Sequence, residues 1–108
     1  MQDVPGQIMV YGEVVPFADT KNDKEQALKP LEEAAEVFGA WQRLRSECHD
    51  DCGKCVNRCI NHTLFVDECA DVVQAVTNLL DAVGISCMEH AMADCRQRNE
   101  ERGRRYVK

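Results

Sequence analysis

The sequence lacks any surplus of basic residues, since 13 Lys and Arg stand against 19 Asp and Glu for a formal net charge of −6. Affinity for DNA or RNA depends on Lys and Arg that neutralise phosphates, so a nucleic-acid polymer is not an expected partner. The sequence also lacks an apolar run near the roughly 20 residues that span a bilayer, and its N-terminus has no basic segment followed by an apolar one. We therefore expect a cytoplasmic protein with no membrane partner.

Proline and glycine are scarce, at three and six residues in 108, which leaves little room for long disordered segments. A chain of this length has the usual size of one domain. Cysteine is the exception, with seven residues. In the reducing cytoplasm, an odd number of cysteines argues against a disulfide framework and for free thiols or a metal site.

The first half of the chain predicts an arm followed by a long helix. Residues 1–20 are typical of an extended arm or one short hairpin, and a helix then begins near residues 20–23, whose short polar side chains can cap it, and runs to about residue 46. Pro30 predicts either a kink or the true start of that helix. After it, five apolar residues recur at helical spacing and predict a buried stripe: Leu31, Ala34, Ala35, Phe38 and Trp41.

The second half predicts two more helices. One covers residues 63–83, ends at Gly84 as a left-handed stop, and has a wide apolar face that only other helices could cover. The other opens with Ser86 and Glu89 as a capping box and ends at Gly103. We expect an all-α bundle of about four helices over residues 21–108, with a cysteine-rich linker at 47–62. So small a bundle would gain from burying surface against a copy of itself, which predicts a homodimer or homotetramer.

Two pairs of acids stand out on the predicted helices: Glu33 with Glu36, and Glu68 with Asp71. Residues three apart on a helix lie about 60° apart around its axis, so each pair can share one ion. One such pair occurs on many solvated helices. Two pairs, each set into an otherwise apolar helix, favour a site in which four oxygen donors hold Mg²⁺, with Mn²⁺ as an alternative.

These residues resemble a known family. The string from Leu31 to Glu36, followed by the string from Glu68 to Val73, is similar to the ExxE and ExxD signature of the MazG-like all-α nucleoside triphosphate pyrophosphohydrolases. Asn78 falls where that family places an asparagine after its ExxD. The resemblance covers about residues 25–103, and its two motifs are short.

The resemblance implies a Mg²⁺-dependent hydrolase that cleaves a ribo- or deoxyribonucleoside triphosphate into monophosphate and pyrophosphate, with the four acids as metal ligands. It assigns Asn78 to the nucleotide, and it makes residues of the C-terminal helix candidates for phosphate contacts. The general base is unassigned, because any of the acids could orient a metal-bound water and both Glu32 and Glu33 are in reach. The preferred base of the substrate is open as well. The candidate substrate-binding residues are Asn78, Arg98, Asn99, Arg102, Lys29 and Trp41, although a tryptophan at that spacing is more often part of a core.

A cysteine cluster departs from the family pattern. Its four thiols within twelve residues suit a structural tetrahedral Zn²⁺ site: Cys48, Cys52, Cys55 and Cys59. His49 or His62 could replace one thiolate, an iron–sulfur cluster takes the same ligands, and helical spacing could equally place these residues on one stripe as buried thiols. The cysteine cluster also suggests an alternative function for the whole chain. In it, the protein is a non-catalytic helical module that is stabilised by zinc and binds a partner protein.

Overall fold

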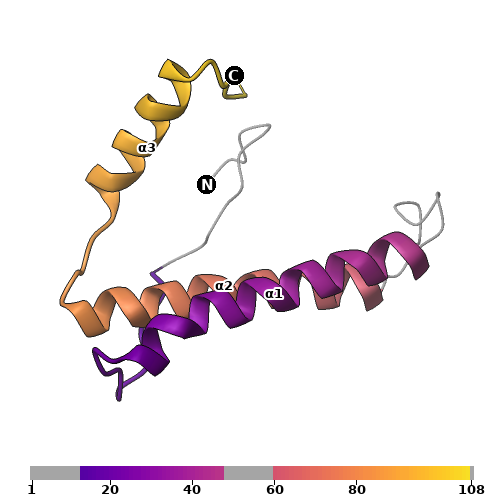
Figure 1. The fold of residues 1–108 in the computed structure, drawn as a ribbon, viewed down its shortest axis with the longest axis horizontal. Coiled ribbons are helices and arrows are strands. Elements are labelled where there is room, and N and C mark those ends of the chain that lie inside the picture. The colour runs from indigo at the N-terminus through magenta and orange to yellow at the C-terminus, as the bar shows by residue number, and fades with distance from the viewer. Residues whose placement is uncertain (1–12, 48–59, 108) are drawn as a thin grey trace. The chain divides into compact units, whose positions relative to one another are not determined.

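The computed structural model describes residues 13–47 and 60–107, and within these ranges it contains three α-helices and no strand (Figure 1). They are α1 (Lys24–Glu47), α2 (Ile60–Val83) and α3 (Glu89–Glu101). The all-α class is thereby confirmed. The segment expected to supply a fourth element, residues 48–59, lies outside the described residues.

The start of α1 is fixed by Asp23. The backbone N–H of Gln26 donates to Asp23 Oδ1 at 2.9 Å, and the N–H of Ala27 donates to the Asp23 carbonyl at 3.1 Å. This is the geometry of a capped N-terminus, in which a short side chain accepts from a free amide of the first turn. Because the cap lies upstream, Pro30 falls inside α1, and the alternative that the helix starts at Pro30 is wrong.

Helices α1 and α2 pack against each other as an antiparallel hairpin (Figure 1). The predicted end of α2 is confirmed: Gly84 has a φ of +96°, and its N–H donates to the carbonyls of Leu80 and Asp81 at 3.0 and 2.9 Å. A residue without a side chain is favoured in this left-handed conformation because it avoids the Cβ clash. The hairpin, with residues 14–23 preceding it, makes one compact unit, Val14–Gly84.

The core of this unit is thin. Among the described residues only Ala40, Ala75 and Asn78 are buried, and the predicted apolar stripe on α1 is not: Leu31 is 69% exposed and Phe38 is 58% exposed in the single chain. The prediction of a buried stripe is therefore wrong for the chain by itself. The reason is geometric, because at 100° per residue the stripe lies roughly opposite the face with which α1 meets α2.

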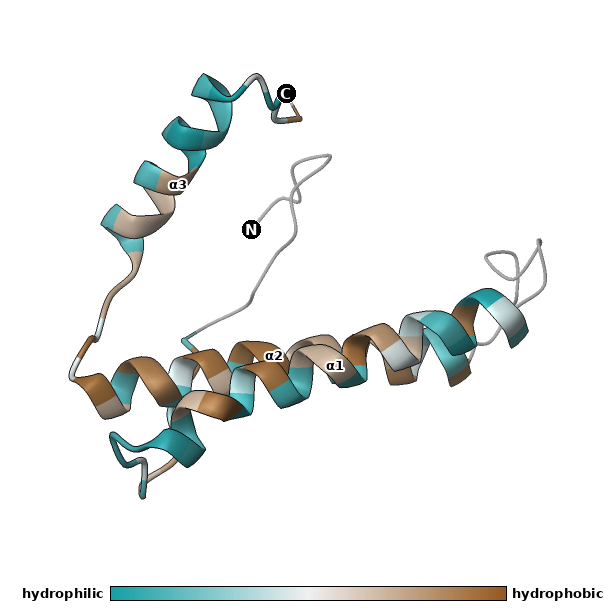
Figure 2. Cartoon of the chain, viewed as in Figure 1, coloured by the Kyte–Doolittle hydropathy of each residue, from teal (hydrophilic) through white to brown (hydrophobic). Residues whose placement is uncertain are grey.

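Helix α3 belongs to a second compact unit. Its first residue is Glu89, and the preceding Met88 makes no side-chain capping bond, so the predicted capping box of Ser86 and Glu89 is wrong. The predicted stop is confirmed by Gly103, whose φ is +86°. Figure 2 shows that α2 is rich in apolar residues whereas α3 is mostly polar. No helix in the described ranges is both long and apolar enough to cross a bilayer.

Candidate functional site

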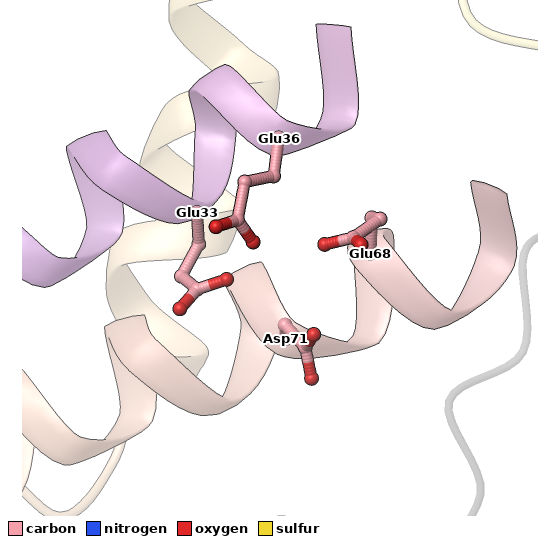
Figure 3. Close-up of side chains that lie close together, drawn as sticks. All are labelled: Glu33, Glu36, Glu68 and Asp71. Carbon is pink, nitrogen blue, oxygen red and sulfur yellow. The ribbon is translucent and has the colours of Figure 1, made fainter. Parts of the chain in front are cut away.

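The two predicted acid pairs come together between α1 and α2. One carboxylate oxygen from each of Glu33, Glu36, Glu68 and Asp71 can be chosen so that all four lie within 4.8 Å of one another. Figure 3 shows the two α1 side chains and the two α2 side chains on facing sides of the hairpin, with Glu36 and Glu68 extending towards each other. The antiparallel packing of two long helices positions this cluster, since each pair needs only its own i, i+3 spacing.

One carboxylate oxygen of Glu68 lacks a hydrogen-bond partner among the residues that the structure describes. This atom, Oε2, is also buried from solvent. Buried polar atoms are nearly always hydrogen-bonded, because removing a carboxylate oxygen from water without compensation costs free energy. Since the nearest polar groups in the cluster are three further acids, the missing partner is expected to be a cation or a proton.

The pKa values of Glu33 and Glu68 are raised, as expected for carboxyl groups that lie among other acids. Burial raises the pKa of Glu68, and a hydrogen bond to Glu36 and the negative charges of Glu36 and Asp71 raise it further, against an opposing effect of Arg43. A hydrogen bond shared with Glu36 is the main cause of the raised pKa of Glu33, followed by burial and by the charges of Glu36 and Asp71. Ionised carboxylates this close repel one another, and a positive charge among them would offset that repulsion.

A cleft of about 540 Å³ adjoins the acids, and Glu33 and Asp71 are shared between the two features. Its lining carries both signs of charge and one aromatic ring. The lining residues are Phe17, Asp19, Lys21, Asp23, Glu25, Gln26, Lys29, Glu33, Asp71, Gln74, Ala75 and Asn78. A cleft beside a cluster of acids can hold a ligand that reaches a metal with one end and the protein with the other.

Asn78 lines the cleft, and Gln74 and the residues before α1 hold it there. The backbone N–H of Phe17 donates to Asn78 Oδ1 at 2.9 Å, and Gln74 Nε2 donates to the same atom at 3.0 Å and to the Val15 carbonyl at 2.9 Å. Thr20 Oγ1 also donates to Asp81 on α2. The sequence interpretation missed Phe17 and Gln74, because contacts between residues 59 and 61 positions apart leave no local pattern, although Gln74 does precede Asn78 by one helical turn.

Lys29 and Trp41 differ in their relation to the cleft. Lys29 lines it, and its ammonium also pairs with Glu32 at 3.3 Å on the exposed side of α1, which raises the pKa of Lys29. Trp41 is absent from the lining: its ring stacks on Phe38 with centroids 5.9 Å apart, and the guanidinium of Arg45 lies 5.9 Å from it. Of these two candidates, the structure brings only Lys29 to the cleft.

The C-terminal candidates all belong to α3 or its cap. Arg98 lies in the last turn of α3 and Arg102 is its C-cap, while Asn99 Nδ2 donates to Tyr106 at 3.3 Å and to Cys95 Sγ at 3.5 Å. The amide of Asn99 is thus used within its own unit. The four cysteines predicted to bind zinc, at positions 48, 52, 55 and 59, lie outside the described residues.

Comparison with known proteins adds no assignment. No family model, curated protein or solved structure matches this chain.

Proposed function

We propose that the protein is a Mg²⁺-dependent nucleoside triphosphate pyrophosphohydrolase of the MazG-like kind, which releases a nucleoside monophosphate and pyrophosphate. The observation that carries the proposal is the buried, unpartnered Oε2 of Glu68 within a cluster of four carboxylates. A cation at this position would neutralise negative charge on all four carboxylates. A fully solvated acidic face, by contrast, would leave no such oxygen buried. The ExxE and ExxD pattern supports the choice of reaction.

The donor set suits Mg²⁺. Four hard oxygen donors from Glu33, Glu36, Glu68 and Asp71 match its preference for carboxylates, and Glu36 and Asp71 are exposed enough to leave room for water and phosphate oxygens. When bound, Mg²⁺ would neutralise phosphate charge and make an attacking water easier to deprotonate. The chain's own acids would hold the ion and orient the water, and they provide carboxylates that could accept its proton.

The adjoining cleft supplies what the rest of a nucleotide requires. Lys21 and Lys29 line it and can offset phosphate charge, while Asn78 offers a carboxamide and Phe17 an aromatic ring to the nucleoside. The lining also carries five acids, so binding of a triphosphate there would depend on Mg²⁺ at the acid cluster as well as on the two lysines. Such an enzyme would act in the cytoplasm, where it would clear or regulate a nucleotide pool.

The test is pyrophosphate release from a panel of ribo- and deoxyribonucleoside triphosphates, measured with Mg²⁺ and with a chelator. We expect Mg²⁺-dependent formation of monophosphate and pyrophosphate in equal amounts. Glu68→Gln should abolish it, and Asp67→Asn serves as the matched control, since Asp67 is the adjacent exposed acid of α2 outside the cluster. No release from any member of the panel, or release that the chelator leaves unchanged, would refute the proposal.

The exposed stripe on α1 favours a homodimer as the working form. Leu31, Phe38 and Trp41 are 69%, 58% and 45% exposed in the single chain, and a contiguous apolar surface of this kind usually meets another protein. A second copy would complete the helical bundle that one hairpin leaves open. The same stripe supports the alternative function, a helical module that binds a partner protein without catalysis. Light scattering at several concentrations separates the two: a dimer is expected, and a monomer at all concentrations would favour the partner-binding module.

A further inference from the structure

The chain reverses direction directly after α3, and backbone hydrogen bonds fix this reversal. Gly103 has a φ of +86°, and its N–H donates to the Glu100 carbonyl at 3.0 Å. The N–H of Arg104 donates to the Asn99 carbonyl at 2.9 Å. This pair of bonds is the Schellman arrangement, in which a glycine past the last turn helps to satisfy the final carbonyls of a helix. The residues that follow are thereby directed back onto α3.

Tyr106 contacts α3 as a result of the reversal. Its hydroxyl accepts a hydrogen bond from Asn99 Nδ2 at 3.3 Å, and the centre of its ring lies 4.7 Å from the guanidinium carbon of Arg96. A guanidinium over an aromatic ring is attracted to the negative face of that ring. Tyr106 therefore positions the side chain of Arg96 from the segment that follows the helix.

A cleft of about 470 Å³ lies at this reversal, and its lining includes three arginines: Arg96, Arg104 and Arg105. They are opposed there by one acid, Glu100, whose carboxylate lies 3.8 Å from Nε of Arg96. Arg104 and Arg105 form no ion pair with any residue that the structure describes. The cleft consequently holds an excess of positive charge, and Tyr106 adds an aromatic ring to it.

The charge around this cleft is opposite to that of the whole chain. Residues 96–107 include five arginines and two glutamates, although the formal net charge of the protein is −6. The negative end of a helix dipole attracts cations to the last turn, but this effect falls off quickly, and Arg104 and Arg105 follow the helix. Like charges gathered this closely repel one another, so a bound anion would stabilise the arrangement.

We propose that this cleft binds a phosphoryl group, which comes either from an inorganic anion such as pyrophosphate or from the phosphate chain of a nucleotide. Guanidinium groups present paired N–H donors that match phosphate oxygens, and they stay charged at physiological pH. A phosphoryl group brings up to two charges and three acceptor oxygens to the three arginines, whereas a carboxylate brings one charge and two oxygens. The volume of the cleft is that of a small-molecule site.

This site is distinct from the acid cluster. Its lining lies entirely after residue 95, and it includes neither Arg98 nor Arg102, the arginines that the family resemblance made candidates for phosphate contacts. Binding there needs no metal ion, because the arginines themselves supply the positive charge. The proposal therefore goes beyond the proposed function and does not depend on it.

Calorimetric titration of the full chain with inorganic pyrophosphate tests the proposal. A chelator is present, because metal ions would otherwise bring pyrophosphate to the acid cluster. We expect saturable binding, and replacing both Arg104→Gln and Arg105→Gln should weaken it at least about tenfold through the loss of charge-assisted hydrogen bonds.

The matched control combines Lys24→Gln and Arg45→Gln, which remove the same two charges from α1 outside this cleft. Its affinity for pyrophosphate should be close to that of the wild type. Absence of binding by the wild type, or equal affinities for the two double variants, would overturn the proposal.

A variant that changes no charge distinguishes a positioned site from a merely basic surface. Tyr106→Ser removes the ring beside Arg96 and leaves every arginine in place, so affinity should fall roughly three- to fivefold. General electrostatic attraction would be unchanged by it. Circular dichroism confirms that the variant is folded, and unchanged affinity would overturn the role of the cleft.

Two further titrations identify the source of the phosphoryl group. Tighter binding of a nucleoside diphosphate than of pyrophosphate would assign the site to a nucleotide, and the reverse order would assign it to an inorganic anion. A polyglutamate peptide that bound more tightly than both would overturn the proposal, because it would make the cleft a surface for an acidic protein segment.

Discussion

The two faces of α1 reverse the usual arrangement of an amphipathic helix. The face against α2 carries Glu33 and Glu36 beside the buried Ala40, whereas the opposite face carries Leu31 and Phe38 in the open. Amphipathic helices usually bury their large apolar residues and expose their acids. The inner face therefore presents four carboxylates that could hold a cation, and the outer face leaves large apolar side chains exposed in the single chain.

The inner face should show the largest effect. Glu68→Gln removes the carboxylate whose Oε2 is buried without a partner. Activity should fall roughly 100-fold or more, because loss of a group that only supports a metal ligand already lowers activity about 10- to 100-fold. Stability without metal should rise, because one source of repulsion among the acids is gone. Asp67→Asn should change neither quantity. Steady-state kinetics and thermal melting in a chelator provide both values, and full activity in Glu68→Gln would remove Glu68 from the site.

The outer face should show the next effect. Phe38→Ser should destabilise the protein by about 1–3 kcal/mol and weaken self-association, since a contact between copies would bury most of that ring. Gln42→Ser, at an exposed polar position one turn later on α1, is the control and should have little effect. Chemical denaturation and light scattering measure the two outcomes. If Phe38→Ser were as stable and as associated as the control, the outer face would not be an interface.

A third effect concerns pH. The pKa values of Glu33 and Glu68 are raised in the folded state, so folding takes up protons at and above the ordinary glutamate pKa of about 4.3. Stability without metal should therefore be highest below that value and should fall as pH rises through the raised pKa values. Mg²⁺ should reverse the trend, because it binds the ionised acids. Melting temperatures from pH 4 to 8, with Mg²⁺ and with chelator, give both curves, and identical curves would contradict a metal at the acids.

The smallest effect is expected where α1 is solvated. Glu32 pairs with Lys29 at 3.3 Å with both side chains half exposed, so Glu32→Gln should change stability by less than about 1 kcal/mol. Activity should be retained, because Glu32 is not one of the four clustered acids, whereas Glu33 is. Kinetics of Glu32→Gln therefore test whether Glu32 serves as general base, whereas Glu33→Gln should lose activity through its place in the acid cluster alone. Loss of activity in Glu32→Gln alone would assign that role to Glu32.

Local sequence signals predicted the helices and the acid cluster well. Gly84 and Gly103 mark helix ends, Asp23 lies in the predicted capping segment, and the i, i+3 pairs needed only two helices side by side to meet. These features depend on residues within one or two turns of each other. Spacing therefore carries the information needed to place them.

The errors and omissions depended on tertiary context. The Ser86 and Glu89 pattern was present, but α3 starts at Glu89 itself. The apolar stripe containing Phe38 was recognised correctly as a stripe, yet periodicity cannot say which of two faces a neighbouring helix covers. The pairing of Phe17 with Asn78 joins residues 61 apart and could not be read from either segment.

The most direct measurement is binding of Mn²⁺, a paramagnetic substitute for Mg²⁺, followed by electron paramagnetic resonance. Wild-type protein and Asp67→Asn should both bind the ion and release it to excess Mg²⁺, and Glu68→Gln should bind it at least about tenfold more weakly. Equal binding by all three proteins, or none by the wild type, would contradict a metal centre between α1 and α2.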